Sequence, residues 1–199
     1  AMERGDWKMA AQLKPQASKW PYADAMTHFA RAIGAARSGD AAAAREDVAQ
    51  LAKVRDALAS AKDVYWSEQV EIQRLAAQAW IELAQGRRDD ALALVRQSAE
   101  RQDASEKATV TPGHLAPSRE LLGEMLLELN QPAEALKAFE ASALDNPKRF
   151  RGTYGAALAA ARAGDGARAK THYTRLLELA GKGDARPELQ QAKTWLTRN

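Results

Sequence analysis

Cysteine is absent from this chain of 199 residues, and histidine occurs only three times, as His28, His114 and His172. Without thiols the chain can form no disulfide, no thiolate metal site and no cysteine nucleophile. The three histidines are never spaced i,i+4, so a metal site would need ligands that converge from distant segments. We therefore expect no metal and no cofactor, with His28 and His172 solvated on helix surfaces or lining a groove.

Long apolar runs and a strong net charge are also missing. No run approaches the ~18 residues of a membrane-spanning helix, so we expect no membrane span. The formal net charge is only +3 and is spread along the chain, which argues against a nucleic-acid-binding protein. No signal peptide or transit segment is recognisable, and the sequence leaves both a cytoplasmic and an exported location open.

Catalytic motifs are scarce as well. Residues 164–171, GDGARAKT, come close to two phosphate-binding motifs, with Ala169 where the GxxxxGKT loop has glycine. Both motifs need a β-strand that leads into the loop, whereas the preceding residues 156–163 are alanine-rich and typical of a helix. No serine or threonine lies in a GxSxG motif, and the carboxylates are dispersed. We therefore predict that the chain is not an enzyme.

Helix-forming residues dominate instead, because alanine is abundant and runs of β-branched residues are scarce. The clearest segment is 116–147, which has apolar residues at helical spacing on both sides of a break at 130–132. The first helix carries Leu121, Leu122, Met125, Leu126 and Leu129, and the second carries Ala135, Leu136, Phe139 and Ala143 on its inner side. Neither helix can bury its apolar stripe alone, so neighbouring helices must stack on the pair.

This segment resembles a tetratricopeptide repeat (TPR), a helix–turn–helix unit of about 34 residues that stacks into solenoids. The positions that match the family pattern are the Leu122-Gly123 pair, Leu126, the small residue Ala135, the aromatic Phe139 and the closing Pro147. The sequence departs from the pattern at two positions. Arg119 stands where the family has tryptophan, and Asn130 replaces the turn glycine.

A fixed spacing supports further repeats. Gly5-Asp6 and Gly39-Asp40 are 34 residues apart, as are Asn130 and Gly164. We predict an all-α fold of about ten helices, arranged as antiparallel pairs in a right-handed TPR-like superhelix. The chain would begin inside a repeat, as the C-terminal part of a longer, bacterial-type TPR protein.

A single array is predicted to span residues 1–199. It would consist of a repeat remnant over 1–20, four repeats over 21–61, 65–107, 116–149 and 150–181, and a capping helix over 186–197.

The resemblance implies a binding groove formed by the first helices of the repeats. Positions five, nine and thirteen of such a helix recur about every four residues and share one face. The groove candidates are Phe29, Ile33, Arg37, Trp80, Glu120, Glu124, Glu128, Tyr154, Leu158 and Arg162. Trp80 and Tyr154 are the expected aromatic anchors, and a plain ion pair between Glu128 and Arg162 is the alternative to a role of those two residues in recognition. The lysines and asparagines of the family's clamp for chaperone tails are absent from this face.

The function implied by the resemblance is a non-enzymatic scaffold that binds a protein or peptide in this groove. Two alternatives stay open. One is a module of an enzyme or metal-dependent protein whose chemistry lies in a missing N-terminal part, and the other is an array that mediates self-association. The irregular segment 108–117, which contains His114, is a further candidate surface because loops often carry function.

Ala135 and Ala169 occupy the same repeat position, and we predict that both are buried where helices cross. A larger side chain there would push the helices apart, and overpacking typically costs ~1–3 kcal/mol. We expect Ala135→Leu and Ala169→Leu each to lower the melting temperature measured by circular dichroism. Unchanged melting temperatures would mean that the repeat register is wrong.

Overall fold

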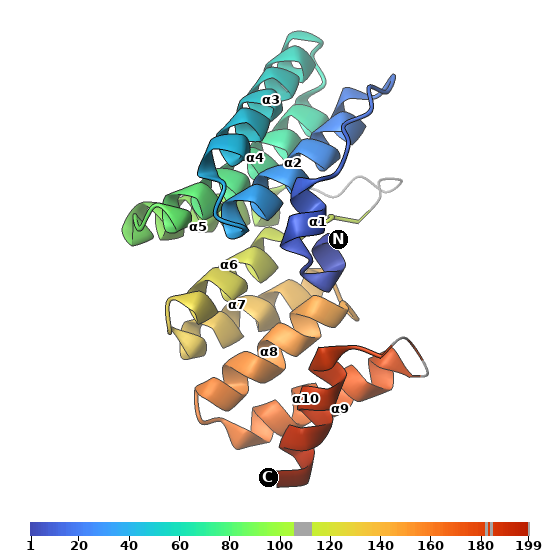
Figure 1. The fold of residues 1–199 in the computed structure, drawn as a ribbon, viewed down its shortest axis with the longest axis vertical. Helices are drawn as coiled ribbons and strands as arrows, with labels where there is room; N and C mark the ends of the chain where they lie inside the picture. The colour runs from blue at the N-terminus through green and yellow to red at the C-terminus, as the bar shows by residue number, and fades with distance from the viewer. Residues whose placement is uncertain (106–112, 182, 184, 199) are drawn as a thin grey trace. The chain divides into compact units, whose positions relative to one another are not determined.

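The computed structural model describes residues 1–105, 113–181, 183 and 185–198. Within these residues it contains ten α-helices, one short 3₁₀ turn and no β-strand (Figure 1). The all-α prediction of about ten helices is thereby confirmed. The chain divides into two compact units, Ala1–Ser118 and Arg119–Asn199. The single array over 1–199 and its right-handed twist stay predictions.

The first unit consists of two long helix pairs preceded by a short helix (Figure 1). Its elements are the 3₁₀ turn Met2–Arg4, α1 (Trp7–Ala11), α2 (Pro21–Arg37), α3 (Ala41–Ser60), α4 (Val64–Ala84) and α5 (Arg88–Ala104). Helix α2 packs against α1, α3 and α4, while α4 also packs against α3 and α5. Because three helices contact α2, little of its circumference is left for solvent.

Glycine and aspartate form the turn between α2 and α3, as the sequence predicts. Gly39 has a φ of 88°, in the left-handed region that favours glycine. The Asp40 side chain then caps α3 by accepting a hydrogen bond of 3.0 Å from the Ala43 backbone N–H. The tight turn reverses the chain, so α2 and α3 run antiparallel.

The second unit contains two shorter helix pairs and a final helix. Its helices are α6 (Ser118–Glu128), α7 (Pro132–Asp145), α8 (Phe150–Arg162), α9 (Gly166–Ala180) and α10 (Pro187–Arg198). Helix α8 packs against both α7 and α9, and α10 packs against α9. Asn130 has a φ of 58° between α6 and α7, so asparagine fills the left-handed turn position where the family pattern has glycine.

The ring of Phe139 is the central packing element of the second unit. It lies between Gly123 on α6 and Gly155 on α8, and a β-carbon would come within 2.7 Å of the ring at Gly123 and 2.4 Å at Gly155. Both glycines therefore make room for the ring. Packing between the two helix pairs of this unit depends on that space, since Phe139 is fully buried.

Burial confirms the prediction for Ala135 and Ala169, both of which are completely enclosed. The prediction for Ala143 is wrong, because Ala143 is exposed and Ser142 is buried in its place. The reason is geometric: seven residues make two turns of an α-helix, so Ser142 rather than Ala143 lines up with Ala135.

The glycine beside Phe139 yields a testable consequence. We expect Gly155→Ala to destabilise the fold by ~1–3 kcal/mol because the new methyl group overlaps the ring. Gly166→Ala is the matched control, since a β-carbon at this helical glycine would meet nothing within 4 Å. Urea unfolding followed by circular dichroism measures both variants. Equal stability of the two variants would contradict the packing described here.

Candidate partner-binding surface

Helices α2 and α4 lie side by side and parallel in the first unit. At their N-terminal ends the ring of Tyr22 stacks on Trp66, with centroids 3.9 Å apart and ring planes 5° apart. At their C-terminal ends the guanidinium of Arg37 lies over the ring of Trp80, 4.0 Å from its centroid. Contacts at both ends require that the helices run in the same direction. Their N-terminal ends therefore form one continuous edge.

Four aromatic residues gather at this edge, namely Trp20, Tyr22, Tyr65 and Trp66, and we refer to them as the aromatic cluster. Besides the Tyr22–Trp66 stack, the Trp20 and Tyr22 centroids are 6.0 Å apart, and Tyr65 meets Trp66 edge-on at 5.1 Å. These separations are those that aromatic pairs favour. Trp20 is 51% exposed, and the other three rings are partly exposed.

At the C-terminal ends of α2 and α4, cation–π contacts replace the exposed rings. The guanidinium of Arg37 lies between two indole rings, 4.1 Å from the centroid of Trp7 on α1 and 4.0 Å from that of Trp80 on α4. Cation–π contacts of this kind are strongest when the cation is shielded from water. Trp80 is only 2% exposed. Arg37 thus joins α1 and α4 across the end of α2.

In the second unit, a carboxylate is buried between α6 and α8. Glu120 on α6 is 2% exposed and accepts a hydrogen bond of 2.8 Å from Arg149 Nε. A β-carbon at Gly152 on α8 would lie 2.6 Å from its Oε1 atom. Glycine at position 152 therefore makes the space for the carboxylate. The pair links α6 to the start of α8.

Two further side chains of this unit form hydrogen bonds with neighbouring helices. Glu124 accepts a hydrogen bond of 3.0 Å from Arg151 Nε, and the Tyr154 hydroxyl donates one of 2.6 Å to Gln191 Oε1 on α10. Burial raises the pKa of Tyr154, and the nearby charge of Glu188 raises it further. This hydrogen bond links α8 to α10.

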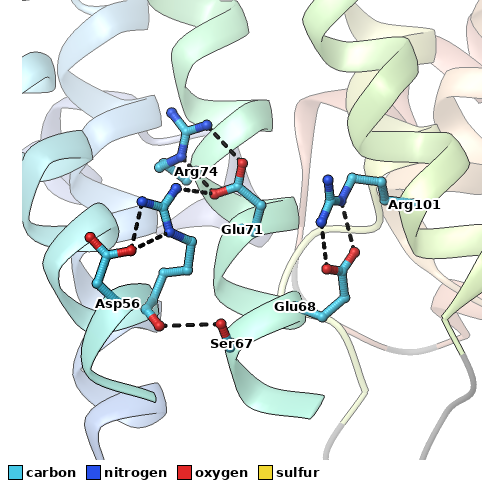
Figure 2. A network of polar contacts seen from close by, with 7 residues as sticks. Asp56, Ser67, Glu68, Glu71, Arg74 and Arg101 are labelled. Atoms are coloured by element: carbon cyan, nitrogen blue, oxygen red, sulfur yellow. Dashed lines mark hydrogen bonds and ion pairs between the residues drawn. The ribbon is translucent and has the colours of Figure 1, made fainter. Parts of the chain in front are cut away.

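An ion-pair network joins the helices of the first unit (Figure 2). The Glu71 carboxylate accepts hydrogen bonds from Arg55 (2.7 Å) and from Arg74 (2.8 Å), which links α3 to α4. Glu68 and Arg101, 2.6 Å apart at the closest atoms, link α4 to α5. Burial alone would raise the pKa of Glu71, but the hydrogen bonds from Arg74 and Arg55 outweigh it and hold the pKa below its usual value.

Two of the histidines each lie beside a carboxylate that also contacts an arginine, Arg31 at Asp47 and Arg168 at Glu140. His28 Nδ1 lies 2.7 Å from Asp47 and His172 Nε2 lies 3.2 Å from Glu140. Among the described residues, no group of three or more His, Asp or Glu side chains could hold a metal ion. His114 is partly exposed, whereas residues 108–112 of the candidate segment lie outside the described part of the chain.

Residues 164–171 have no strand before them, as the sequence predicts. They form the turn after α8 and the start of α9, where the Asp165 side chain caps the helix by accepting from the Arg168 backbone N–H at 2.9 Å. None of the described helices is both long enough and apolar enough to cross a bilayer.

The chain is similar to the crystal structure of nearly identical TPR-like repeats from a Podosopora anserina protein assigned as a kinesin light chain. The TM-score is 0.59 at 19% sequence identity, and the match covers 91% of this chain and 87% of the other. This chain has a TPR-like repeat fold. No family model matches the sequence, and no curated protein does either. In the repeats predicted from the sequence, α2, α4, α6 and α8 are the first helices.

Burial corrects four of the groove candidates. Phe29, Ile33 and Trp80 are buried in the first unit, and Glu120 is buried in the second. They hold helices together and offer no surface to a partner in this structure. Phe29 and Ile33 are enclosed because α2 has helices on three sides, and Trp80 because Arg37 covers its ring.

The remaining candidates keep some exposure. Glu128 and Arg162 are exposed, and Arg37, Glu124, Tyr154 and Leu158 are partly exposed. Arg162 Nη1 lies 3.5 Å from the Leu127 carbonyl oxygen, at the limit of a hydrogen bond. The role of these six residues in binding stays a prediction.

The sequence-based groove omitted the aromatic cluster. A signal for it exists: Tyr22 is the second residue of α2 and Trp66 is the third residue of α4. Alignment of the two repeats by their helix starts would have brought these rings together. Alignment by the turn glycines misses them, because α4 is four residues longer than α2.

The network around Glu71 predicts how stability depends on pH. The pKa of Glu71 is lower in the folded state than in the unfolded chain. The ionised carboxylate therefore adds to the free energy of unfolding at neutral pH, and this contribution is lost as the pH falls through the folded-state pKa. We expect Glu71→Gln to cost ~1–3 kcal/mol at pH 7, and the difference from the parent protein to shrink in acid. Denaturant unfolding across the acidic range measures it.

Glu68→Gln is the control on the same helix, since its ion pair with Arg101 is more exposed. We expect it to cost ~0–1 kcal/mol. If Glu71→Gln loses no more stability than Glu68→Gln at pH 7, the network does not hold α3 to α4 as described.

Proposed function

We propose that the chain is a non-enzymatic scaffold that binds a segment of another protein at the N-terminal edge of α2 and α4. The observation that carries this proposal is the aromatic cluster, with Trp20 half exposed. Tryptophan and tyrosine are enriched among the residues that dominate binding energy at protein interfaces. The TPR-like repeat fold supports the proposal, since it supplies two parallel first helices whose starts meet.

The cluster is also held in place before any partner arrives. The Tyr22–Trp66 stack and the edge-on contact of Tyr65 fix three rings against one another. A partner would therefore lose little free energy in ordering them, and binding is favoured by such pre-organisation. The exposed indole of Trp20 provides the surface that a partner side chain can cover.

Peptide display on the whole chain tests this proposal. Random peptides are selected against the immobilised protein, and the selected peptides are measured by calorimetry against the parent protein and two variants. We expect saturable one-to-one binding that Trp20→Ala weakens by roughly tenfold or more. The control Leu144→Ala removes an even more exposed apolar side chain, 83% exposed on α7, and should leave affinity unchanged.

Two results would contradict the proposal. If selection yields no peptide that binds saturably, the scaffold function is wrong. If Trp20→Ala and Leu144→Ala weaken binding equally, the aromatic cluster is not the binding site. Circular dichroism confirms that each variant is folded. Concentration-dependent dimerisation in sedimentation that Trp20→Ala abolishes, in the absence of any peptide binder, would instead favour self-association.

A further inference from the structure

We infer that the aromatic cluster recognises an acidic segment, in which an apolar or aromatic side chain is flanked by Asp or Glu. This inference rests on the proposed function and adds the chemistry of the partner to it. It is based on the charged side chains around the cluster. The carboxylates accept hydrogen bonds from groups of the chain, whereas the two lysines pair with no carboxylate among the described residues.

Two lysines lie at the edge formed by α2 and α4. Lys19 Nζ is 5.1 Å from the centroid of the Trp20 ring, and Lys62 is exposed in the turn that leads into α4. Among the described residues, neither ammonium group pairs with a carboxylate within the chain. Both can therefore pair with an incoming anion beside the exposed indole.

The carboxylates in the same region are already engaged. Asp24 accepts the Ser18 backbone N–H at 3.0 Å, and Asp63 accepts the Trp66 backbone N–H at 3.2 Å. Glu68, one turn further along α4, is paired with Arg101. These donors partly offset the negative charges of the three carboxylates. The chain's own carboxylates therefore compete little with those of a partner for Lys19 and Lys62.

Apolar surface beside the lysines completes the site. Val64, the first residue of α4, is 77% exposed, and Trp20 is half exposed. An apolar partner side chain can cover the exposed indole of Trp20 while its acidic neighbours reach Lys19 and Lys62. A surface that combines aromatic rings with cations at its margin has the composition of an interface centre with a charged rim.

A protein segment fits this surface better than an anionic membrane does. Of the large apolar side chains at the edge, Trp20 and Val64 are exposed, whereas Tyr22, Tyr65 and Trp66 are partly buried against one another. Insertion into a bilayer requires a broader exposed apolar face. The flat, pre-stacked rings suit a single side chain of a protein partner.

Two fluorescein-labelled peptides of equal length test the inference by fluorescence anisotropy with the whole chain. Both carry the same central leucine and tryptophan, which are flanked by glutamate in one peptide and by lysine in the other. We expect the glutamate peptide to bind at least ~10-fold more tightly. Raising the salt from ~0.05 to ~0.5 M should weaken its binding, because the pairs are exposed.

Charge reversal locates the site. We expect the double substitution Lys19→Glu and Lys62→Glu to weaken binding of the glutamate peptide by roughly tenfold or more. The control with the same change in net charge is the double substitution Lys137→Glu and Lys148→Glu: both lysines are exposed, and Lys148, like Lys62, lies in a left-handed turn, with φ of 63° against 62°. It should leave the affinity unchanged.

Each other outcome overturns the inference in a distinct way. Equal binding of the two peptides, or equal effects of the two double substitutions, would remove the preference for acidic partners. The scaffold function would still stand if display peptides depend on Trp20. Sedimentation with phosphatidylserine vesicles that Trp20→Ala abolishes, without binding of the glutamate peptide, would assign the cluster to a membrane.

Discussion

Parallel packing of α2 against α4 is the contact on which the proposed surface depends. It brings two helix starts together, so rings that are distant in sequence, Tyr22 and Trp66, meet face to face. A single helix pair would present only one of these rings. The repeat architecture thus creates the aromatic cluster from residues that have no local reason to interact.

Polar and cation–π contacts hold this arrangement from the sides. Arg37 joins α1 and α4 across the far end of α2, and the carboxylate of Glu71 joins α3 to α4. These contacts cover the middle and the C-terminal ends of α2 and α4. Exposed aromatic surface is left at the N-terminal edge, where a partner can reach it.

Periodicity predicted the helices, their turns and the enclosed positions Ala135 and Ala169, because these depend on residues close in sequence. It did not predict that Phe29 and Ile33 are buried, since periodicity shows which residues share a face but not how many helices cover that face. Periodicity also could not predict the burial of Glu120, because that burial requires Gly152 and Arg149 from a helix pair further along the chain. The aromatic cluster also arises only from such long-range pairing.

Nuclear magnetic resonance of the five tryptophan indole N–H groups tests the central claim most directly. The nitrogen-15-labelled chain is titrated with the glutamate-flanked peptide, and signals are assigned with Trp→Phe variants. We predict that the signals of Trp20 and Trp66 shift progressively, while those of the buried Trp80 and of Trp195, which packs on Tyr173, stay in place. Shifts confined to Trp80 or Trp195, or no shift at saturating peptide, would contradict it.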